Sequence, residues 1–250
     1  MKNIASSGGV IERLYKLMPP GIKPRFTTVQ EWKAWQAQEG RRYACEVMRH
    51  NEQIRTERLM GRSGIQALHR HCTFDNYVAT CDGQRHALSM ARRYAQDFGK
   101  GFGGFVFSGK PGTGKNHLAA AICNRLLQTN HTALMITVPD LSAKIRSTYE
   151  AGGGAESAML EDICRVHLLV LDDVGVQRFT RNEWVLLNQI VDRRLSTLRP
   201  VGILTNLNHQ QTSDVLGVRI MDRLKMDSGI WVNFDWQSYR SKVKHVHLLN

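Results

Sequence analysis

The segment Gly109-Lys110-Pro111-Gly112-Thr113-Gly114-Lys115 is the most informative part of the sequence, and it closely follows the apolar residues Phe105-Val106-Phe107. It fits the pattern G-x-x-x-x-G-K between a predicted strand and a predicted helix over 115–128, which is the context of a P-loop. The glycines let successive backbone N–H groups converge on phosphate oxygens, and the helix N-terminus adds partial positive charge. We therefore predict a phosphate site in which Lys115 reaches the β and γ phosphates.

The residue after this motif departs from the usual pattern. Position 116 is Asn, where Ser or Thr is expected to hold Mg²⁺ through its hydroxyl. An amide oxygen is also a hard, neutral ligand, so Asn116 can hold Mg²⁺ directly or through water.

Two acids follow the apolar run 168–171, at the carboxyl end of a predicted buried strand. This is the edge where doubly wound sheets bind ligands. Asp172 is placed to hold Mg²⁺, and Asp173 is placed to polarise the attacking water. ATPases of this layout more often have Glu at the second position. Because Asp is one methylene shorter, we expect slow hydrolysis or a water relay.

Polar and basic residues follow another predicted strand, 202–205. Asn206 ends this strand and can orient a water molecule against the γ-phosphate. Arg219 and Arg223 lie four apart on one helix face and suggest a finger that reaches the γ-phosphate of a neighbouring subunit. The alternative is an ordinary surface ion pair of Arg223 with Asp222 or Asp227.

Strand and helix patterns alternate through the rest of this region. The apolar strands predict an α/β fold with a buried, doubly wound, mostly parallel sheet. We expect a Gly-rich loop, 152–154, before the third strand, and a capping box of Thr180 with Glu183 before the fourth helix. The predicted strands are 105–107, 133–138, 168–171, 202–205 and 230–234, and the predicted helices are 83–97, 115–128, 140–150, 182–196 and 214–226.

The N-terminal part, residues 1–60, predicts a small, separate all-α domain. Helical spacing is seen over 10–18, and Thr28 with Glu31 forms a capping box. Trp32 and Trp35 then lie three apart on one helix face, and Gly40 is expected to end that helix before another over 41–60. The two tryptophans are either the core of this domain or a docking site for a partner.

Charge and composition point to a globular protein with an acidic partner. The chain has 250 residues, 42% hydrophobic and 22% charged, and a net charge of +12. Residues 1–70 hold 13 Lys and Arg against 6 Asp and Glu, hence +7. Such an excess attracts nucleic acid or an acidic protein surface. No apolar run approaches the length that spans a bilayer, and no signal peptide is evident, so we expect a cytoplasmic protein without membrane partners.

Residues 61–75 contain breakers and polar residues, and we interpret them as a linker to a second domain, 76–250. The group His69, His71, Cys72 and Cys81 could in principle ligate zinc. Its spacing matches no common structural zinc motif, and adjacent ligands at 71 and 72 are geometrically awkward. We therefore favour free thiols and linker histidines.

Together these motifs resemble the AAA+ ATPases and, more closely, the DnaC family of replicative helicase loaders. The resemblance covers nearly the whole chain, and the unusual Asn116 is itself part of that family's P-loop. A phage or prophage version is as compatible with it as a housekeeping loader. It rests on Gly-Lys-Pro-Gly-Thr-Gly-Lys-Asn-His-Leu-Ala-Ala-Ala-Ile-Cys-Asn (109–124), Ile190-Val191-Asp192-Arg193-Arg194, Leu204-Thr205-Asn206 and Ser238-Tyr239-Arg240.

The resemblance implies a function and a set of roles. The 1–60 domain would bind the hexameric DnaB-type helicase, and the 76–250 AAA+ domain would bind ATP or ADP with Mg²⁺, assemble in a spiral or ring with the helicase, and bind single-stranded DNA. The catalytic residues would be Asp173, Asn206 and Arg223, and the metal ligands Asn116 and Asp172. The nucleotide contacts would be Gly109, Lys110, Pro111, Gly112, Thr113, Gly114, Lys115, Asn116, His117 and Arg240.

The resemblance also bears on the DNA path and on rival functions. Lys144, Arg146 and Tyr149 combine cations with an aromatic ring, which suits phosphate contact and base stacking, although a solvated helix face is the simpler alternative.

Trp32 and Trp35 would contact the helicase. Two rival functions remain: an IstB-like transposition ATPase, and a nucleotide-binding switch with little hydrolysis.

Overall fold

The computed structural model describes residues 28–60, 64–149, 154–175, 181–227 and 229–239. The chain divides into two compact units, Met1–Val47 and Met48–Asn250. Among the described residues, no helix combines the length and the apolar character that a membrane span requires.

Five parallel strands form the sheet of the larger unit. They are β1 (Phe105–Gly109), β2 (Ala133–Thr137), β3 (Leu168–Val174), β4 (Val201–Thr205) and β5 (Ile230–Phe234). Their order in space is β2-β3-β4-β1-β5, and every pairing is parallel. β4 thus lies between β1, which leads into the P-loop, and β3, which carries the two acids. The predicted doubly wound parallel sheet is confirmed.

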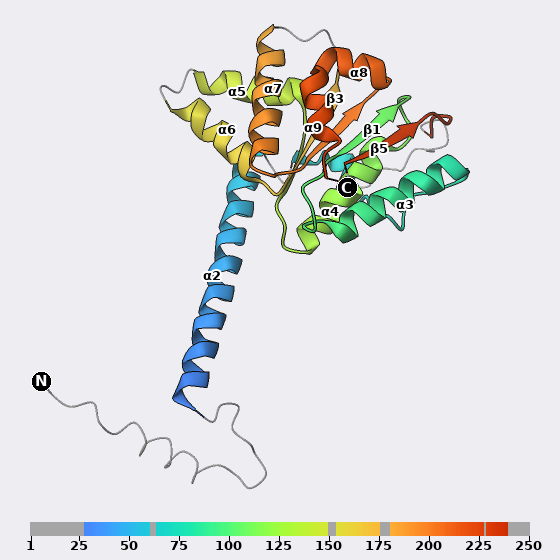
Figure 1. The fold of residues 1–250 in the computed structure, drawn as a ribbon. Coiled ribbons are helices and arrows are strands. Elements are labelled where there is room, and N and C mark those ends of the chain that lie inside the picture. Colours follow the sequence, from blue (N-terminus) through green and yellow to red (C-terminus); the bar gives the residue numbers. More distant parts are fainter. Residues whose placement is uncertain (1–27, 61–63, 150–153, 176–180, 228, 240–250) are drawn as a thin grey trace, which may run out of the picture. The chain divides into compact units, whose positions relative to one another are not determined.

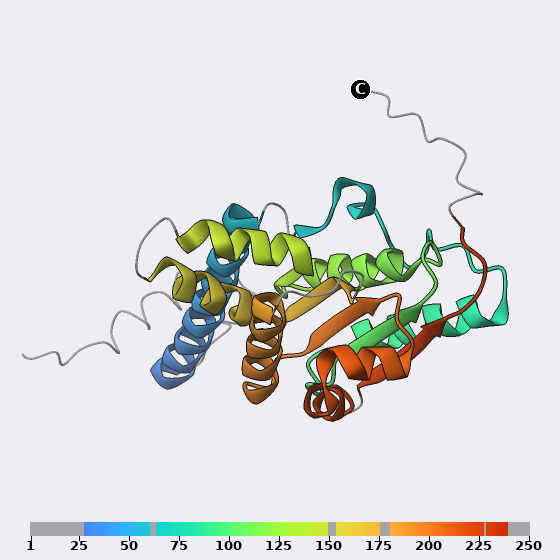
Figure 2. The same ribbon diagram turned by 90° about the horizontal axis from the view of Figure 1, so that it is seen from above.

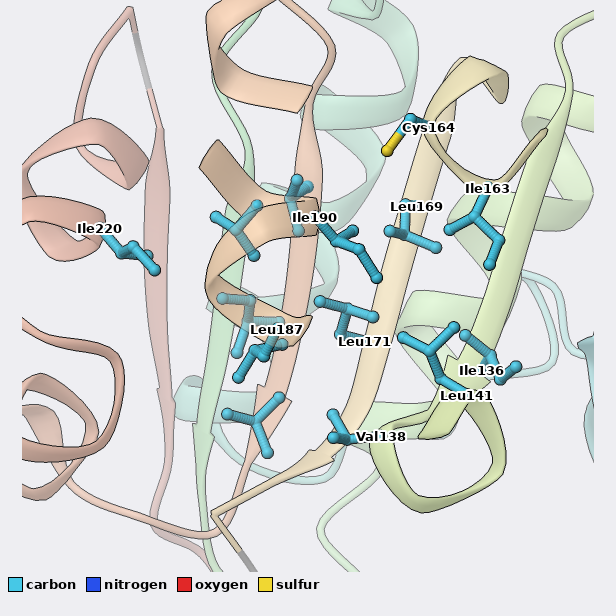
Figure 3. Packing of buried hydrophobic residues seen from close by; sticks show 14 of the residues in the cluster. Ile136, Val138, Leu141, Ile163, Cys164, Leu169, Leu171, Leu187, Ile190 and Ile220 are labelled. Carbon is cyan, nitrogen blue, oxygen red and sulfur yellow. The ribbon is translucent and has the colours of Figure 1, made fainter. Parts of the chain in front are cut away.

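Helices cover both faces of this sheet (Figures 1 and 2). One face packs on α3 (Asp82–Asp97) and α4 (Lys115–Gln128). The other packs on α5 (Val138–Tyr149), α6 (Ala155–Arg165), α7 (Arg181–Ser196), α8 (His209–Leu216) and α9 (Val218–Leu224). Side chains alternate along each strand, so Phe105 and Phe107 enter the first core and Val106 the second. Figure 3 shows part of the second core, where Leu169 and Leu171 of β3 lie near Ile163, Leu187 and Ile190.

Two sequence predictions for these helices are wrong. The region after the Gly-rich loop contains α6, which was not predicted before β3. The helix predicted over 214–226 is two helices, because Gly217 between them has φ +81°, a conformation that ends a helix. α8 begins earlier, since Asn208 and Gln211 form a reciprocal capping box.

The described part of the smaller unit is helical. The helix α2 (Val29–Met60) begins at the predicted capping box, in which the Thr28 and Glu31 side chains each accept the other's backbone N–H. Gly40 does not end it, so that prediction is wrong. A glycine inside a helix costs only about 1 kcal/mol, and the Arg42 side chain spans it to reach both Glu39 and Glu46. The predicted helix over 10–18 lies outside the described residues.

The segment that we interpreted as a linker packs against the larger unit from residue 64 onward. Ile65 and Cys72 are buried in the core under α3 and α4. The Asn124 amide donates to the backbone carbonyls of His69, Arg70 and Cys72. This segment, with a short 3-10 turn at Ala67–His69, is therefore fixed on α4.

The side chain of Arg194 on α7 is fully buried at the amino edge of the sheet. Its guanidinium donates to five backbone carbonyls, at 2.8–3.2 Å, where α6 ends and where β3 and β4 begin. Burial lowers the pKa of Arg194 to about 9. The carbonyls compensate this cost, and those of Ile163, Cys164 and Val166 lie at the C-terminal end of α6, where the helix dipole favours a cation.

We predict that Arg194→Met lowers the free energy of unfolding by about 2–4 kcal/mol, because it leaves buried carbonyls without donors. Chemical denaturation measures this change. Arg193→Met is the matched control, since Arg193 is exposed on the same helix, and a change of under about 0.5 kcal/mol is expected there. Equal effects of the two variants would contradict the argument.

Candidate nucleotide-binding site

A cleft of about 450 Å³ opens at the carboxyl edge of the sheet. This is the edge at which ligands bind to open α/β sheets. Its walls come from the P-loop, from the ends of β3 and β4, and from segments before α3 and after β5. The lining residues are Gln66, Leu68, His69, Asn76, Tyr77, Val78, Gln84, Pro111–His117, Asp172, Asp173, Thr205, Asn206 and Tyr239.

The P-loop backbone takes the conformation for which its glycines are needed. Gly109, Gly112 and Gly114 have φ of +132°, +75° and +95°, which side-chain-bearing residues rarely adopt. A Cβ on Gly109 would also lie 2.2 Å from the carbonyl oxygen of Phe234. The loop therefore curls as predicted, with α4 beginning at Lys115.

The chain after β5 holds this loop from outside. The Lys110 N–H donates to the Phe234 carbonyl at 2.9 Å, and the Tyr239 N–H donates to the Gly112 carbonyl at 2.8 Å. The Trp236 indole N–H donates to the Thr113 carbonyl at 2.9 Å. These bonds turn carbonyls of the loop toward the 234–239 segment.

The ammonium group of Lys115 lies within the loop, and its side chain is 5% exposed. Its Nζ donates to the carbonyls of Gly109 and Lys110 at 2.7 and 2.8 Å, and to Asn206 Oδ1 at 2.9 Å. The structure therefore brings together the P-loop lysine and the polar residue that ends β4. A single positive charge at this point is suited to phosphate oxygens.

Asn116 and Asp172, the two predicted metal ligands, lie in contact. The Asn116 amide donates to Asp172 Oδ2, and the Asp173 backbone N–H donates to Asp172 Oδ1 at 2.8 Å. Asp172 is only 7% exposed, and burial raises its pKa to about 6. A buried carboxylate beside an amide is a donor set that Mg²⁺ accepts, and the cation would offset the cost of burying the charge.

Asp173 lies in a bulge of β3. The pairing register between β3 and β4 shifts between Leu171 and Val174, and Asp173 has φ +56°. The bulge turns Asp173 outward into the cleft while Asp172 stays buried. Bulges with a left-handed residue recur beside active sites, and Asp tolerates that conformation better than Glu. The backbone thus gives a physical reason for Asp at this position.

One wall of the cleft was not predicted from sequence. It is formed by residues 66–84, where the Tyr77 hydroxyl donates to the Thr113 carbonyl at 3.4 Å. His117 reaches back to this wall, with Nε2 3.0 Å from the Thr73 carbonyl oxygen and its ring against Tyr77. Burial lowers the pKa of His117. No local sequence pattern reveals this wall, because its position depends on how the segment crosses α4.

Other predicted site residues lie outside this cleft. The Arg223 guanidinium binds Asp192 of α7, and Arg219 lies 3.5 Å from the same carboxylate, so the partner within the chain is neither Asp222 nor Asp227. Lys144 lines a smaller cavity of about 200 Å³ that shares Asp172 with the cleft. Arg146 pairs with Glu183 at 3.7 Å. Arg240, Thr180 and the side chain of Tyr149 lie outside the described residues.

Known proteins are similar to this one over most of the chain. A family model described as IstB-like ATP binding protein matches residues 36–246. The chain is 50% identical over 243 residues to YdaV of Escherichia coli (strain K12), a protein described as uncharacterized, covering 97% of each. It is 46% identical over 243 residues to the replicative helicase loader DnaC of the same organism, covering 97% of this chain and 98% of that protein.

A further sequence relative and two solved structures are also similar to this chain. The DnaC of Buchnera aphidicola subsp. Acyrthosiphon pisum is 42% identical over 234 residues, covering 93% of this chain and 95% of the relative. A crystal structure of a DnaC helicase loader superposes with a TM-score of 0.61 at 22% identity, covering 68% of this chain and 99% of that one. A structure of the replication initiator DnaA bound to AMPPCP and single-stranded DNA superposes with a TM-score of 0.58 at 20% identity, covering 69% of this chain and 51% of that one.

The structural likenesses show the AAA+ fold, and the sequence matches show the family. With a P-loop, a buried acid beside Asn116 and a polar strand end at Asn206 in one cleft, the larger unit has the parts that an ATP-binding protein of this fold requires. The chain belongs to the IstB-like ATP-binding family and, within it, to the DnaC replicative helicase loaders.

Proposed function

We propose that this protein binds a hexameric DnaB-type replicative helicase and, in an ATP-dependent step, delivers it onto single-stranded DNA during replication initiation or restart in the cytoplasm. The observation that carries the proposal is the 46% identity to DnaC over 97% of both chains. A match of that length includes most of the smaller unit as well as the ATPase core. That coverage disfavours a transposition helper, for which only the shared ATPase core would need to match.

In the nucleotide cycle, each residue of the cleft has a distinct task. Lys115 binds the β and γ phosphates, while Asn116 and Asp172 hold Mg²⁺, which neutralises charge on the phosphates when bound. Asp173 accepts a hydrogen bond from the attacking water. Asn206 binds the γ-phosphate or that water from the end of β4. Turnover is slow and rises when single-stranded DNA binds.

The cationic helix α5 supplies the DNA contact. Lys144 and Arg146 lie on this helix directly after β2, and the Arg146 side chain is more than half exposed. Their charges bind phosphates, and Tyr149 on the same helix stacks on a base. Lys144 and Asp172 line the same cavity, which supports a DNA contact close to the proposed metal site.

Arg223 acts on the nucleotide of the next subunit in a spiral or ring. Within one chain it is bound to Asp192 and is 27% exposed. An arginine finger contributes about 10³–10⁵ in rate by stabilising the transferring phosphoryl group. To do so, Arg223 must exchange Asp192 for the phosphate. Arg240 contacts the nucleotide bound in its own chain.

The smaller unit binds the helicase through α2. Val29, Trp32, Tyr43 and Val47 are exposed on this helix. Their spacings of three, eleven and four residues place them on one helical face. Trp32 is 45% exposed, which disfavours a purely core role for it. An exposed aromatic stripe with charged neighbours suits a helix that docks into an apolar groove.

We predict that Trp32→Ala in the full chain weakens helicase binding at least about tenfold, as loss of an aromatic anchor does. Co-purification and titration with the helicase measure this. Arg42→Ala on the same helix is the control, because its exposed ion pairs add little affinity. Unchanged binding by the Trp32 variant, with helicity preserved, would contradict the assignment of helicase binding to α2.

A second prediction concerns hydrolysis. Asp173→Asn retains a residue that tolerates φ +56°, so ATP affinity is expected within twofold of the wild type. Turnover is expected to fall about a hundredfold or more, because the base that polarises water is lost. Asp173→Glu is expected to lower stability by about 1 kcal/mol without a gain in rate. A phosphate-release assay with single-stranded DNA decides, and undiminished turnover by the Asn variant would exclude Asp173 from the reaction.

A further inference from the structure

The turn that carries Asn206 is held by two buried hydroxyl groups. Thr205 at the end of β4 and Ser108 of β1 are each 1% exposed, and they are register partners in the sheet. The Thr205 hydroxyl donates to the Val174 carbonyl at 2.7 Å and accepts from the Leu207 N–H at 3.1 Å. The Ser108 hydroxyl donates to the Leu207 carbonyl at 2.7 Å.

These bonds fix both polar groups of Leu207, the residue after Asn206. The backbone pairing of β1 with β4 ends at Ser108 and Thr205. Beyond this pair, side-chain hydrogen bonds connect the two strands to Leu207. The turn is also packed from the side, since a Cβ on Gly175 would lie 2.3 Å from the Leu207 side chain. Ser108 of β1 and Thr205 of β4 therefore bind Leu207 directly, and β3 is joined to them because the Val174 carbonyl accepts from the Thr205 hydroxyl.

The same turn determines where the Asn206 amide lies. Asn206 Oδ1 accepts from Lys115 Nζ at 2.9 Å, while Asn206 Nδ2 has no hydrogen-bond partner among the described residues. Asn206 lines the cleft, so this amide NH₂ is available to a phosphate oxygen or a water molecule. A shift of about 1 Å in such a group can cost about a hundredfold in rate.

We propose that Thr205 and Ser108 are positioning residues for the hydrolytic site: their hydroxyls fix Leu207 and thereby hold the Asn206 amide beside Lys115 and at a constant position relative to Asp173. The inference rests on the proposed ATP hydrolysis. Neither hydroxyl needs to touch the nucleotide for this role.

The test removes the Thr205 hydroxyl at constant shape. Thr205→Val is expected to lower kcat for ATP about tenfold or more, with the Kd for ATP within twofold, because the amide is misplaced while the P-loop is intact. Thr205→Ser, which restores the hydroxyl, is expected to recover most of kcat. Ser108→Ala is also expected to lower kcat. In an Asn206→Ala background, Thr205→Val is expected to cause no further loss.

Thr132→Val is the matched control. Thr132 is 2% exposed, and its hydroxyl also makes two hydrogen bonds, to His167 Nδ1 and from the His167 N–H. It lies at the opposite edge of the sheet, before β2. Thr132→Val is expected to lower Tm by about as much as Thr205→Val does, but to leave kcat unchanged. An equal kcat loss in both variants would show that Thr205 acts only through stability and would overturn the proposal.

Amide hydrogen exchange of the nucleotide-free chain separates this inference from the proposed function. Thr205→Val is expected to speed exchange of the Leu207 N–H about tenfold or more, since its acceptor is lost, and Thr132→Val is not. Unchanged exchange, or additive effects of Thr205→Val and Asn206→Ala on kcat, would overturn the proposal. If the wild type neither binds nor hydrolyses ATP while Leu207 exchange responds as expected, the proposed function fails and the fixing of the turn still holds.

Discussion

The ammonium group of Lys115 is the point on which the rest of the site depends. It is bound by two carbonyls of the P-loop and by the side chain of Asn206, so it joins the end of β1 to the end of β4. That contact is possible only because parallel strands bring their carboxyl ends to one edge, and because β4 lies between β1 and β3. The same edge places Asp172 beside Asn116. One charge thus sets the spacing of the groups that would surround a triphosphate.

Two buried charged residues, Arg194 and Asp172, are compensated in different ways. Arg194, at the amino edge of the sheet, has five carbonyl partners within the chain and acts as a structural cation. Asp172, at the carboxyl edge, has an amide and a backbone N–H, and burial raises its pKa. The charge at the amino edge is compensated by carbonyls of the same chain, whereas the carboxyl edge has the electrostatics of a site that gains a cation on binding its ligand.

Much of this arrangement could be predicted from sequence, because the signals were local. The P-loop glycines, the apolar strand before Asp172 and the polar end of β4 each follow from residue type and spacing. The sheet topology brings them together without further information. The capping box at Thr28 was predicted correctly for the same reason, since both partners lie within one turn.

The remaining features depend on contacts between distant segments. The wall at residues 66–84 is fixed by Asn124 and His117 of α4, so its own sequence gives no sign of its place. The bulge at Asp173 appears only in the pairing of β3 with β4. The helix α2 continues through Gly40 because a single glycine costs a helix only about 1 kcal/mol, which the rest of a 32-residue helix outweighs. Residue type alone led us to expect slow hydrolysis or a water relay from Asp173, whereas the bulge shows why Asp fits the backbone at this position.

Calorimetric titration of the full chain with ATP, in the presence and absence of Mg²⁺, tests whether this edge of the sheet binds Mg²⁺ and ATP together. We expect one ATP per chain, an affinity about tenfold or more higher with Mg²⁺ than without, and no binding by Lys115→Ala, which lacks the point charge on the phosphates. Binding that is unaffected by Mg²⁺, or that persists in the Lys115 variant, would show that this edge is not the joint site of Mg²⁺ and ATP.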